Sequence, residues 1–267
     1  MQITYSESEM NEALKEERAK FKILLAEDNL INQKVALRIL KFAGYNSSPV
    51  NNGLEAVVAV REGEYDVVLM DVQMPEMDGF TATKMIRHLG NPKDKIPIIA
   101  ITAHALMGDK ERCIDAGMND YVTKPIISEQ LLAIIDKWLG LEKFVPAKTN
   151  EPEEEEDPIF DMLVLEKMSM GDKEFQKELM HSYINDMDER YKKLDEFVKI
   201  KDLEKITNEA HTIKGASYSV GAKKIGDEAL GIELSSKQND IENIFGRMDV
   251  LNKAIEDTKI FLNKFLN

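Results

Sequence analysis

The sequence of 267 residues lacks several features that mark common classes of protein. It contains a single cysteine, Cys113, which excludes an intramolecular disulfide or a cysteine-only metal cluster and is typical of a reducing compartment. We expect Cys113 to be a small buried hydrophobe within a helix. None of the four histidines forms an HxxxH or HExxH pair, so the sequence does not predict a zinc hydrolase.

Long apolar runs and a surplus of basic residues are also missing. No apolar run approaches the roughly 18–20 residues that span a bilayer, and the polar segment 1–20 does not resemble a secretory signal. The formal net charge of −14 disfavours a nucleic-acid-binding surface. A phosphate loop of the form GxxxxGK[ST], a glycine-rich ATP lid and an N-box-like segment are absent from the sequence, so neither an NTPase nor a kinase core is predicted. We therefore expect a cytoplasmic chain that itself enters no membrane.

The negative charge is concentrated in one short segment. Residues 142–161 hold eight acidic and two basic residues, with four consecutive glutamates and three prolines. Such a segment repels itself and cannot bury apolar surface, which favours an extended linker. We predict an N-terminal connector over 1–20, a folded domain over 21–140, an acidic flexible linker over 141–158 and a second folded domain over 159–267.

Short apolar runs alternate with amphipathic stretches in the first of these domains. The runs predict buried strands over 21–26, 66–70, 96–101 and 120–122, with a weaker one over 48–50. Helical patterns lie between and after them, over 31–42, 54–61, 78–89, 106–116 and 128–139. Five β–α repeats predict a doubly wound α/β domain with a five-stranded parallel sheet.

The second domain has no strand-like run. Apolar residues recur at helical spacing over 174–199, 202–220, 222–236 and 241–265, and a shorter helix is expected over 159–168. Four consecutive helices with brief connections predict an antiparallel four-helix bundle.

Polar residues follow the predicted strands of the first domain, at the edge where open α/β sheets bind ligands. Glu27 and Asp28 follow the first strand and Asp71 ends the third, while Thr102 and Lys124 follow the fourth and fifth. Three converging carboxylates repel one another unless a cation lies between them, and oxygen ligands favour Mg²⁺. A lysine and a hydroxyl at the same edge suit phosphoryl oxygens. The set predicts a site for a phosphorylated carboxylate.

A family resemblance rests on four segments of this domain. AEDN (26–29), LMDVQMPEMDG (69–79), AITA (100–103) and YVTKP (121–125) resemble, in order and spacing, the response-regulator receiver domain. The resemblance implies a flavodoxin-like fold with Asp71 as the phosphoacceptor that attacks a phosphohistidine. It also implies that Asp28, Asp71 and the Gln73 carbonyl ligate Mg²⁺, with Glu27, where many receivers have Asp, acting mainly through water.

The same resemblance implies the remaining roles at this edge. Lys124 would pair with the acyl phosphate, held inward by a cis peptide before Pro125. Thr102 would reach the phosphoryl group as the switch residue, and Tyr121 would then move inward to fill the space that Thr102 leaves. A half-buried strand aromatic without any switching role is the alternative for Tyr121.

One histidine of the second domain lies in a suggestive local pattern. His211, Lys214 and Gly215 are spaced i, i+3 and i+4 and share one helical face. A glycine in mid-helix costs about 1 kcal/mol relative to alanine, and here it leaves the imidazole clear for a partner. The alternative is a surface histidine beside a chance glycine.

The longer context of this histidine carries a second resemblance. AHTIKGAS followed by VGA (210–222), after GDKEFQKELM (171–180), resembles the histidine-containing phosphotransfer (HPt) domain. It implies that His211 is phosphorylated on one ring nitrogen, that Lys214 and Gly215 shape its surroundings, and that a receiver docks over this face.

Together the two resemblances predict a phosphorelay protein of a two-component system. Phosphoryl would pass from a sensor histidine kinase to Asp71, then to His211, then to a downstream response regulator. The chain would be a free-standing relay or the C-terminal, cytoplasmic part of a hybrid histidine kinase. A haloacid-dehalogenase-type phosphatase is disfavoured, because Gln73 stands where that family has its acid. A non-catalytic docking module built on the receiver is the alternative function, and the intact acidic pocket argues against it.

Overall fold

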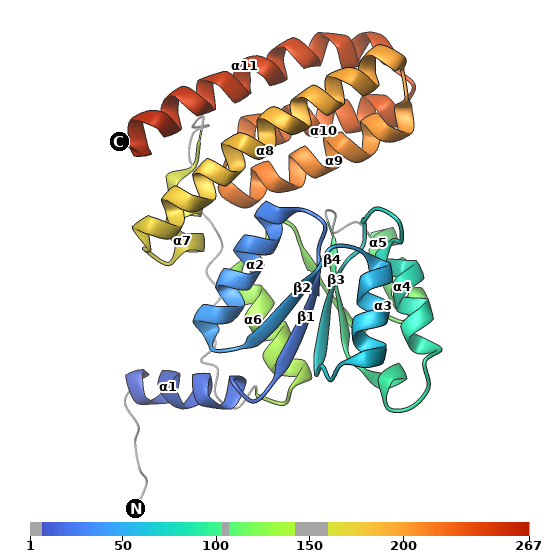
Figure 1. Ribbon diagram of the computed structural model, residues 1–267, viewed down its shortest axis with the longest axis vertical. Helices are drawn as coiled ribbons and strands as arrows, with labels where there is room; N and C mark the ends of the chain where they lie inside the picture. Colours follow the sequence, from blue (N-terminus) through green and yellow to red (C-terminus); the bar gives the residue numbers. More distant parts are fainter. Residues whose placement is uncertain (1–6, 103–106, 142–159, 267) are drawn as a thin grey trace, which may run out of the picture. The chain divides into compact units, whose positions relative to one another are not determined.

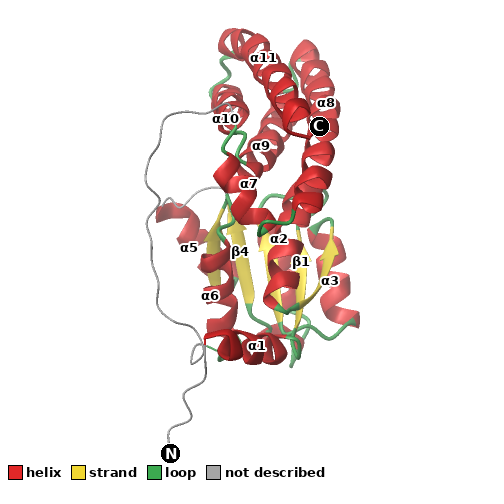
Figure 2. Ribbon diagram, turned by 90° about the vertical axis from the view of Figure 1, so that its left-hand side faces the viewer, coloured by secondary structure: helices red, strands yellow, loops and turns green. Residues whose placement is uncertain are grey.

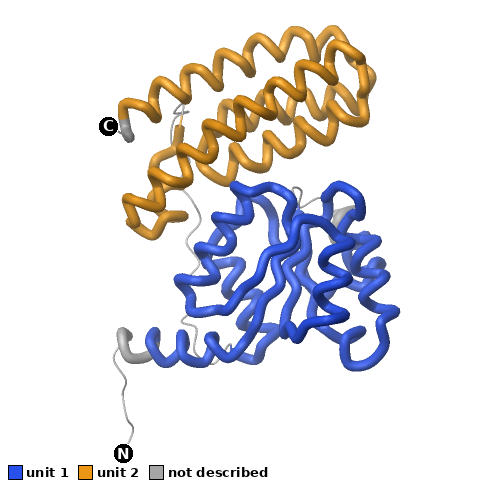
Figure 3. The backbone as a smooth tube through the Cα atoms, in the orientation of Figure 1, with its two compact units in different colours: residues 1–152 blue, residues 153–267 orange. Residues whose placement is uncertain are grey.

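The computed structural model describes residues 7–102, 107–141 and 160–266. The chain divides into two compact units, unit 1 over Met1–Pro152 and unit 2 over Glu153–Asn267 (Figure 3). The predicted acidic linker falls on residues 141–158, of which all but the first lie outside the described ranges. Within the described ranges, no helix combines the length and the apolar character needed to cross a membrane.

Unit 1 is built on a five-stranded parallel sheet with the strand order β2-β1-β3-β4-β5. The strands are β1 (Lys22–Ala26), β2 (Asn46–Val50), β3 (Val67–Asp71), β4 (Ile98–Thr102) and β5 (Asp120–Thr123). This order is that of the doubly wound, flavodoxin-like fold, so the predicted fold class is confirmed.

Helices cover both faces of the sheet (Figure 1). On one face lie α2 (Leu30–Ala43) and α6 (Ser128–Trp138); on the other lie α3 (Gly53–Glu62), α4 (Gly79–Arg87) and α5 (Met107–Ala116), and a 3₁₀ turn, η1 (Lys93–Lys95), precedes β4. The predicted helix over 78–89 begins at Gly79 because Asp78 is its N-cap, with the Asp78 carboxylate accepting the Thr81 N–H at 2.7 Å.

The central strands are buried on both faces, whereas the edge strand β2 is not. Every residue of β3 and β4 is buried, which explains why these strands read as continuous apolar runs. The sequence NSSPV of β2 is polar and largely exposed, and its Pro49 is tolerated because β2 lies at the sheet edge. Cys113 is buried in the core, as predicted.

A further helix, α1 (Glu7–Arg18), precedes the sheet and packs on unit 1. Leu14 and Arg18, one turn apart, form its buried face, and each is less than a tenth exposed. The role of residues 1–20 as a connector stays a prediction.

Unit 2 consists of helices. A short helix, α7 (Met162–Ser169), precedes α8 (Lys173–Ile200), α9 (Leu203–Val220), α10 (Lys223–Lys237) and α11 (Ile241–Leu266). The last four run antiparallel in sequence order and form the predicted bundle (Figure 2). Inside it, the fully buried Tyr183 donates its phenolic O–H to Ser217 at 2.9 Å, which joins α8 to α9.

Candidate functional site

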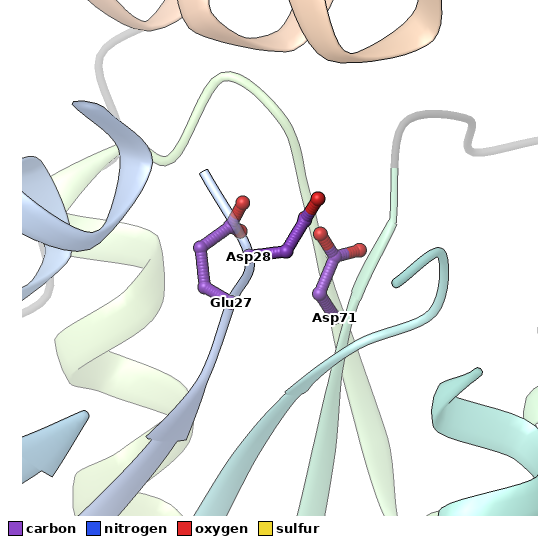
Figure 4. Close-up of side chains that lie close together, drawn as sticks. All are labelled: Glu27, Asp28 and Asp71. Atoms are coloured by element: carbon purple, nitrogen blue, oxygen red, sulfur yellow. The ribbon is translucent and has the colours of Figure 1, made fainter. Parts of the chain in front are cut away.

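The parallel register of unit 1 carries five polar residues to one edge of the sheet. Ala26 of β1 is paired with Met70 of β3, so Glu27 and Asp28 emerge beside Asp71. The three side chains approach one another at this edge (Figure 4), and their ligand atoms lie within 4.8 Å of each other. Thr102 ends β4, and its carbonyl accepts the Lys124 N–H at 2.7 Å.

One lysine contacts two members of this acidic cluster. The Lys124 ammonium is 2.6 Å from Asp71 Oδ2 and 2.8 Å from Glu27 Oε2, and all three side chains are nearly inaccessible to solvent. The peptide bond between Lys124 and Pro125 is cis, as the resemblance implies. Glu27 is held further by Asn32, whose Nδ2 donates to Glu27 Oε1 at 2.9 Å. Glu27 thus accepts a hydrogen bond at Oε1 and is ion-paired with Lys124 at Oε2.

The charges at this edge do not balance. Burial raises the pKa of Asp71 well above its ordinary value, and the nearby Glu27 raises it further, while Lys124 opposes both. Despite its own burial, the pKa of the Lys124 ammonium is raised, because it is paired with these two carboxylates. Three carboxylates around one ammonium leave a surplus of negative charge, and a cation bound through oxygen ligands would relieve it. The residues therefore fit a divalent metal ion.

The loop after β3 folds back against Asp71. The Gln73 backbone N–H donates to Asp71 Oδ1 at 3.1 Å, and Gly79 donates to the Val72 carbonyl at 3.0 Å. A Cβ at Gly79 would lie 2.2 Å from the Asp71 carbonyl oxygen, so a side chain does not fit there. The ligand role of the Gln73 carbonyl stays a prediction.

The two predicted switch residues lie on adjacent strands. Thr102 is 7% exposed at the end of β4, beside Lys124. Tyr121 lies three residues before Lys124 on β5, opposite Ala100, and is partly buried against the hydrophobic core. Their placement is compatible with a switch, and the switching roles stay predictions.

The second cluster is formed by α9 and α10 in unit 2. His211 is buried except for 11% of its side chain, and its Nδ1 lies 3.4 Å from Glu233 Oε1 and 3.3 Å from Lys214 Nζ. Lys214 donates to Glu233 Oε2 at 2.6 Å, and Lys237 donates to Glu233 Oε1 at 2.5 Å. Gly215 lies beside Lys214 in the buried part of α9.

Glu233 was missed by sequence reasoning. Its side chain is 1% exposed, and burial alone would raise the pKa of its carboxyl group, but hydrogen bonds from His211, Lys214 and Lys237 hold that pKa far below the ordinary value. One signal was available: Glu233 continues the buried stripe of Ile225, Ala229 and Ile232 on α10, where an apolar residue is expected. A buried acid in such a stripe requires cationic or hydrogen-bonding partners.

Comparison with protein families assigns both units. The response regulator receiver domain matches residues 23–136, and the Hpt domain matches residues 178–259. The chain therefore carries a receiver domain followed by an Hpt domain, as hybrid histidine kinases do. It is a two-component phosphorelay module, and such domains imply kinases and response regulators as phosphotransfer partners.

Two relatives found by sequence agree with this assignment. The sensor protein GacS of Pseudomonas syringae is 30% identical over 82% of this chain and 25% of its own length. Hybrid signal transduction histidine kinase B of Dictyostelium discoideum is 46% identical over 45% of this chain and 7% of its own length. The chain thus spans a quarter or less of these two relatives. Among solved structures, the magnesium-bound receiver domain of sensor histidine kinase PA1611 from Pseudomonas aeruginosa is 43% identical, covering 45% of this chain and 98% of that one, with a TM-score of 0.43.

Proposed function

We propose that Asp71 accepts a phosphoryl group from the phosphohistidine of a sensor kinase and that His211 passes it to the aspartate of a downstream regulator. The observation that carries this proposal is the presence in one chain of a buried carboxylate paired with a lysine and a buried histidine paired with a carboxylate. The carboxylate paired with a lysine supports the acceptor role of Asp71, and the histidine paired with a carboxylate supports the carrier role of His211.

At the receiver, a carboxylate oxygen of Asp71 attacks phosphorus while the bond from phosphorus to the donor nitrogen breaks, and that nitrogen takes a proton as it leaves. Lys124 faces the same oxygens and neutralises charge on the transferring group. Mg²⁺ bound by Asp28 and Asp71, with the Gln73 carbonyl and with Glu27 through water, would screen the remaining repulsion. A deprotonated Asp71 is required; Lys124 favours that form, while burial and Glu27 oppose it and raise the pKa of Asp71.

Once Asp71 is phosphorylated, Thr102 would signal the change. Its hydroxyl stands at the end of the strand beside β3, and its carbonyl is bonded to Lys124. Movement of Thr102 toward the phosphoryl oxygen would open space for Tyr121 on β5. The alternative without a switching role for Tyr121 predicts no change in its surroundings.

At the Hpt domain, Glu233 fixes the imidazole for phosphotransfer. We assign the proton to Nδ1, which then donates to Glu233 Oε1; Lys214, which can only donate, makes its hydrogen bond to Glu233 Oε2 and not to the imidazole. With the proton on Nδ1, the lone pair of Nε2 is the nucleophile toward an aspartyl phosphate. Lys214 supplies positive charge near the phosphoryl group.

The proposed order of transfer is tested by labelling the protein with a cognate kinase, ATP and Mg²⁺. Wild type is expected to carry label on both Asp71 and His211, Asp71→Asn on neither, and His211→Gln on Asp71 alone. Treatment with alkali separates the two linkages, since an acyl phosphate is hydrolysed by alkali whereas the phosphorus–nitrogen bond of phosphohistidine survives it. Label on His211 in the Asp71→Asn protein would contradict the order. The cytoplasmic location and the choice between a free-standing relay and part of a hybrid kinase stay predictions.

A further inference from the structure

A buried ion pair joins α1 to the rest of unit 1. Arg18 Nε donates to Asp136 Oδ1 at 3.0 Å, and Arg18 Nη2 donates to Asp136 Oδ2 at 2.5 Å. The two residues are 8% and 1% exposed. The guanidinium therefore binds the Asp136 carboxylate of α6 in a bidentate manner, which fixes both the position and the orientation of that carboxylate.

The same arginine also reaches the end of α2. Arg18 Nη1 donates to the Ala43 carbonyl at 3.4 Å, and its guanidinium lies 5.4 Å from the centre of the Tyr45 ring. Tyr45 in turn donates its phenolic O–H to Asp136. The backbone of α1 comes close as well, because a Cβ at Gly44 would lie 2.8 Å from the Lys15 carbonyl oxygen. Arg18 thus ties the last residues of α2 to the last turn of α6.

These two helices begin at the acidic cluster. Helix α2 starts at Leu30, two residues after Asp28, and α6 starts at Ser128, four residues after Lys124. Their opposite ends lie at α1 (Figure 2). One arginine therefore joins the far ends of the two helices whose near ends follow the cluster carboxylates and their lysine.

We propose that Arg18 is a positioning residue for the acidic cluster: α1 clamps α2 against α6 and so sets the placement of Glu27 and Asp28 relative to Lys124. This inference rests on the proposed function of the cluster as a site for Mg²⁺ and a phosphoryl group. A packed helix moves largely as one body. A displacement of Asp136, near the end of α6, is therefore expected to displace Lys124, which lies just before the start of α6. By reciprocity, an occupied cluster holds α1 more tightly.

The test compares Arg18→Met with Lys20→Met in the full-length chain. Both substitutions remove one positive charge, but Lys20 is exposed and pairs with Glu17. The rate of amide hydrogen exchange in α1, measured without metal, reports how firmly α1 is packed on unit 1. Amide chemical shifts of Asp71 and Thr102 during a Mg²⁺ titration give the affinity of the cluster for Mg²⁺. We expect Arg18→Met to accelerate exchange in α1 at least about tenfold and to weaken Mg²⁺ binding about fivefold or more, the lower end of allosteric coupling. Lys20→Met should leave both within about twofold, because an exposed ion pair contributes little.

A second variant separates positioning from stability. Loss of one partner leaves Asp136 buried without its charge partner, which is strongly destabilising, whereas Arg18→Met/Asp136→Leu removes both charges. We expect the double variant to fold, and to bind Mg²⁺ as weakly as Arg18→Met. Unchanged Mg²⁺ affinity in both variants would overturn the proposal, whether or not α1 is released. If the wild-type protein bound no Mg²⁺, the proposed function of the cluster would be refuted. The proposed effect of Arg18 on the cluster would then be refuted as well.

Discussion

The two clusters use the same residue types in opposite proportions. At the receiver, one lysine is shared by two of three carboxylates, and the proposed phosphoacceptor is one of these acids. At the Hpt domain, one buried carboxylate is shared by two lysines, and the proposed phosphoryl carrier is the histidine beside them. The receiver cluster therefore calls for an added cation, whereas the Hpt cluster already contains its positive charge.

Removal of divalent cations is expected to separate the clusters most strongly. With EDTA, labelling of Asp71 by acetyl phosphate should fall at least about 100-fold, because the metal screens repulsion between the incoming group and the carboxylates. Labelling of His211 by phosphoramidate should change less than about twofold, since its charge is already balanced by lysines. Intact-protein mass spectrometry measures the phosphorylation of Asp71 in the His211→Gln variant and that of His211 in the Asp71→Asn variant. An equal loss of labelling at Asp71 and His211 would show that the two clusters do not differ in their need for a divalent cation.

Loss of the Hpt carboxylate is the next largest effect. Glu233→Leu should slow transfer from a phosphorylated receiver to His211 about tenfold or more, the scale of a lost hydrogen bond to a charged group. Glu233→Gln keeps a hydrogen-bond acceptor for His211 Nδ1 and should slow the transfer less. Transfer is followed by rapid quench with labelled receiver. Glu228→Gln, on the same helix and paired with Arg247, is the matched control and should transfer at the wild-type rate.

The two buried carboxyl groups should affect stability with opposite signs. The pKa of Asp71 is raised in the folded state, so its ionisation opposes folding, and stability falls as pH rises through that pKa. The pKa of Glu233 is lowered, so its contribution is complete above the unfolded value near 4.3 and is lost as pH falls through the folded pKa.

Thermal unfolding without Mg²⁺ checks these signs at pH 7. Asp71→Asn should stabilise the receiver, and Glu233→Gln should destabilise the Hpt domain. Acidification toward pH 3 should shrink both differences. A shift of the same sign for both variants at pH 7 would show that the clusters are not electrostatic opposites.

The smallest predicted effect concerns glycine. Gly246 lies within α11, and an added Cβ there would enter open space, so Gly246→Ala should stabilise the bundle by about 0.5–1 kcal/mol through the unfolded chain. Gly79→Ala should instead destabilise the receiver, since its Cβ would meet the Asp71 carbonyl. Calorimetry of the two variants gives the sign at each position.

Features that depend on local pattern were predictable from the sequence. Buried strands such as β3 and β4 read as apolar runs, and the parallel sheet then carries the residues after them to one edge. This is why Asp71 and Lys124 were expected together. The weak signal over 48–50 has the converse cause, because β2 is a polar edge strand.

Features that depend on pairing between distant elements were not predictable. Glu233 meets His211 only because α10 packs along α9, and no local pattern specifies which residues of two helices face each other. Arg18 meets Asp136 across 118 positions in sequence. In both cases the charged side chain is buried, and its partner comes from another helix.

The polar edge strand has a consequence for how this chain behaves among copies of itself. The Val50 carbonyl accepts the Glu27 N–H, so Val50 faces β1 and its neighbour Pro49 turns its nitrogen toward the open side of the sheet. Proline has no hydrogen to donate there, and an added strand would lose a bond at that position. The β2 margin is therefore a poor template for the addition of a strand from a second copy.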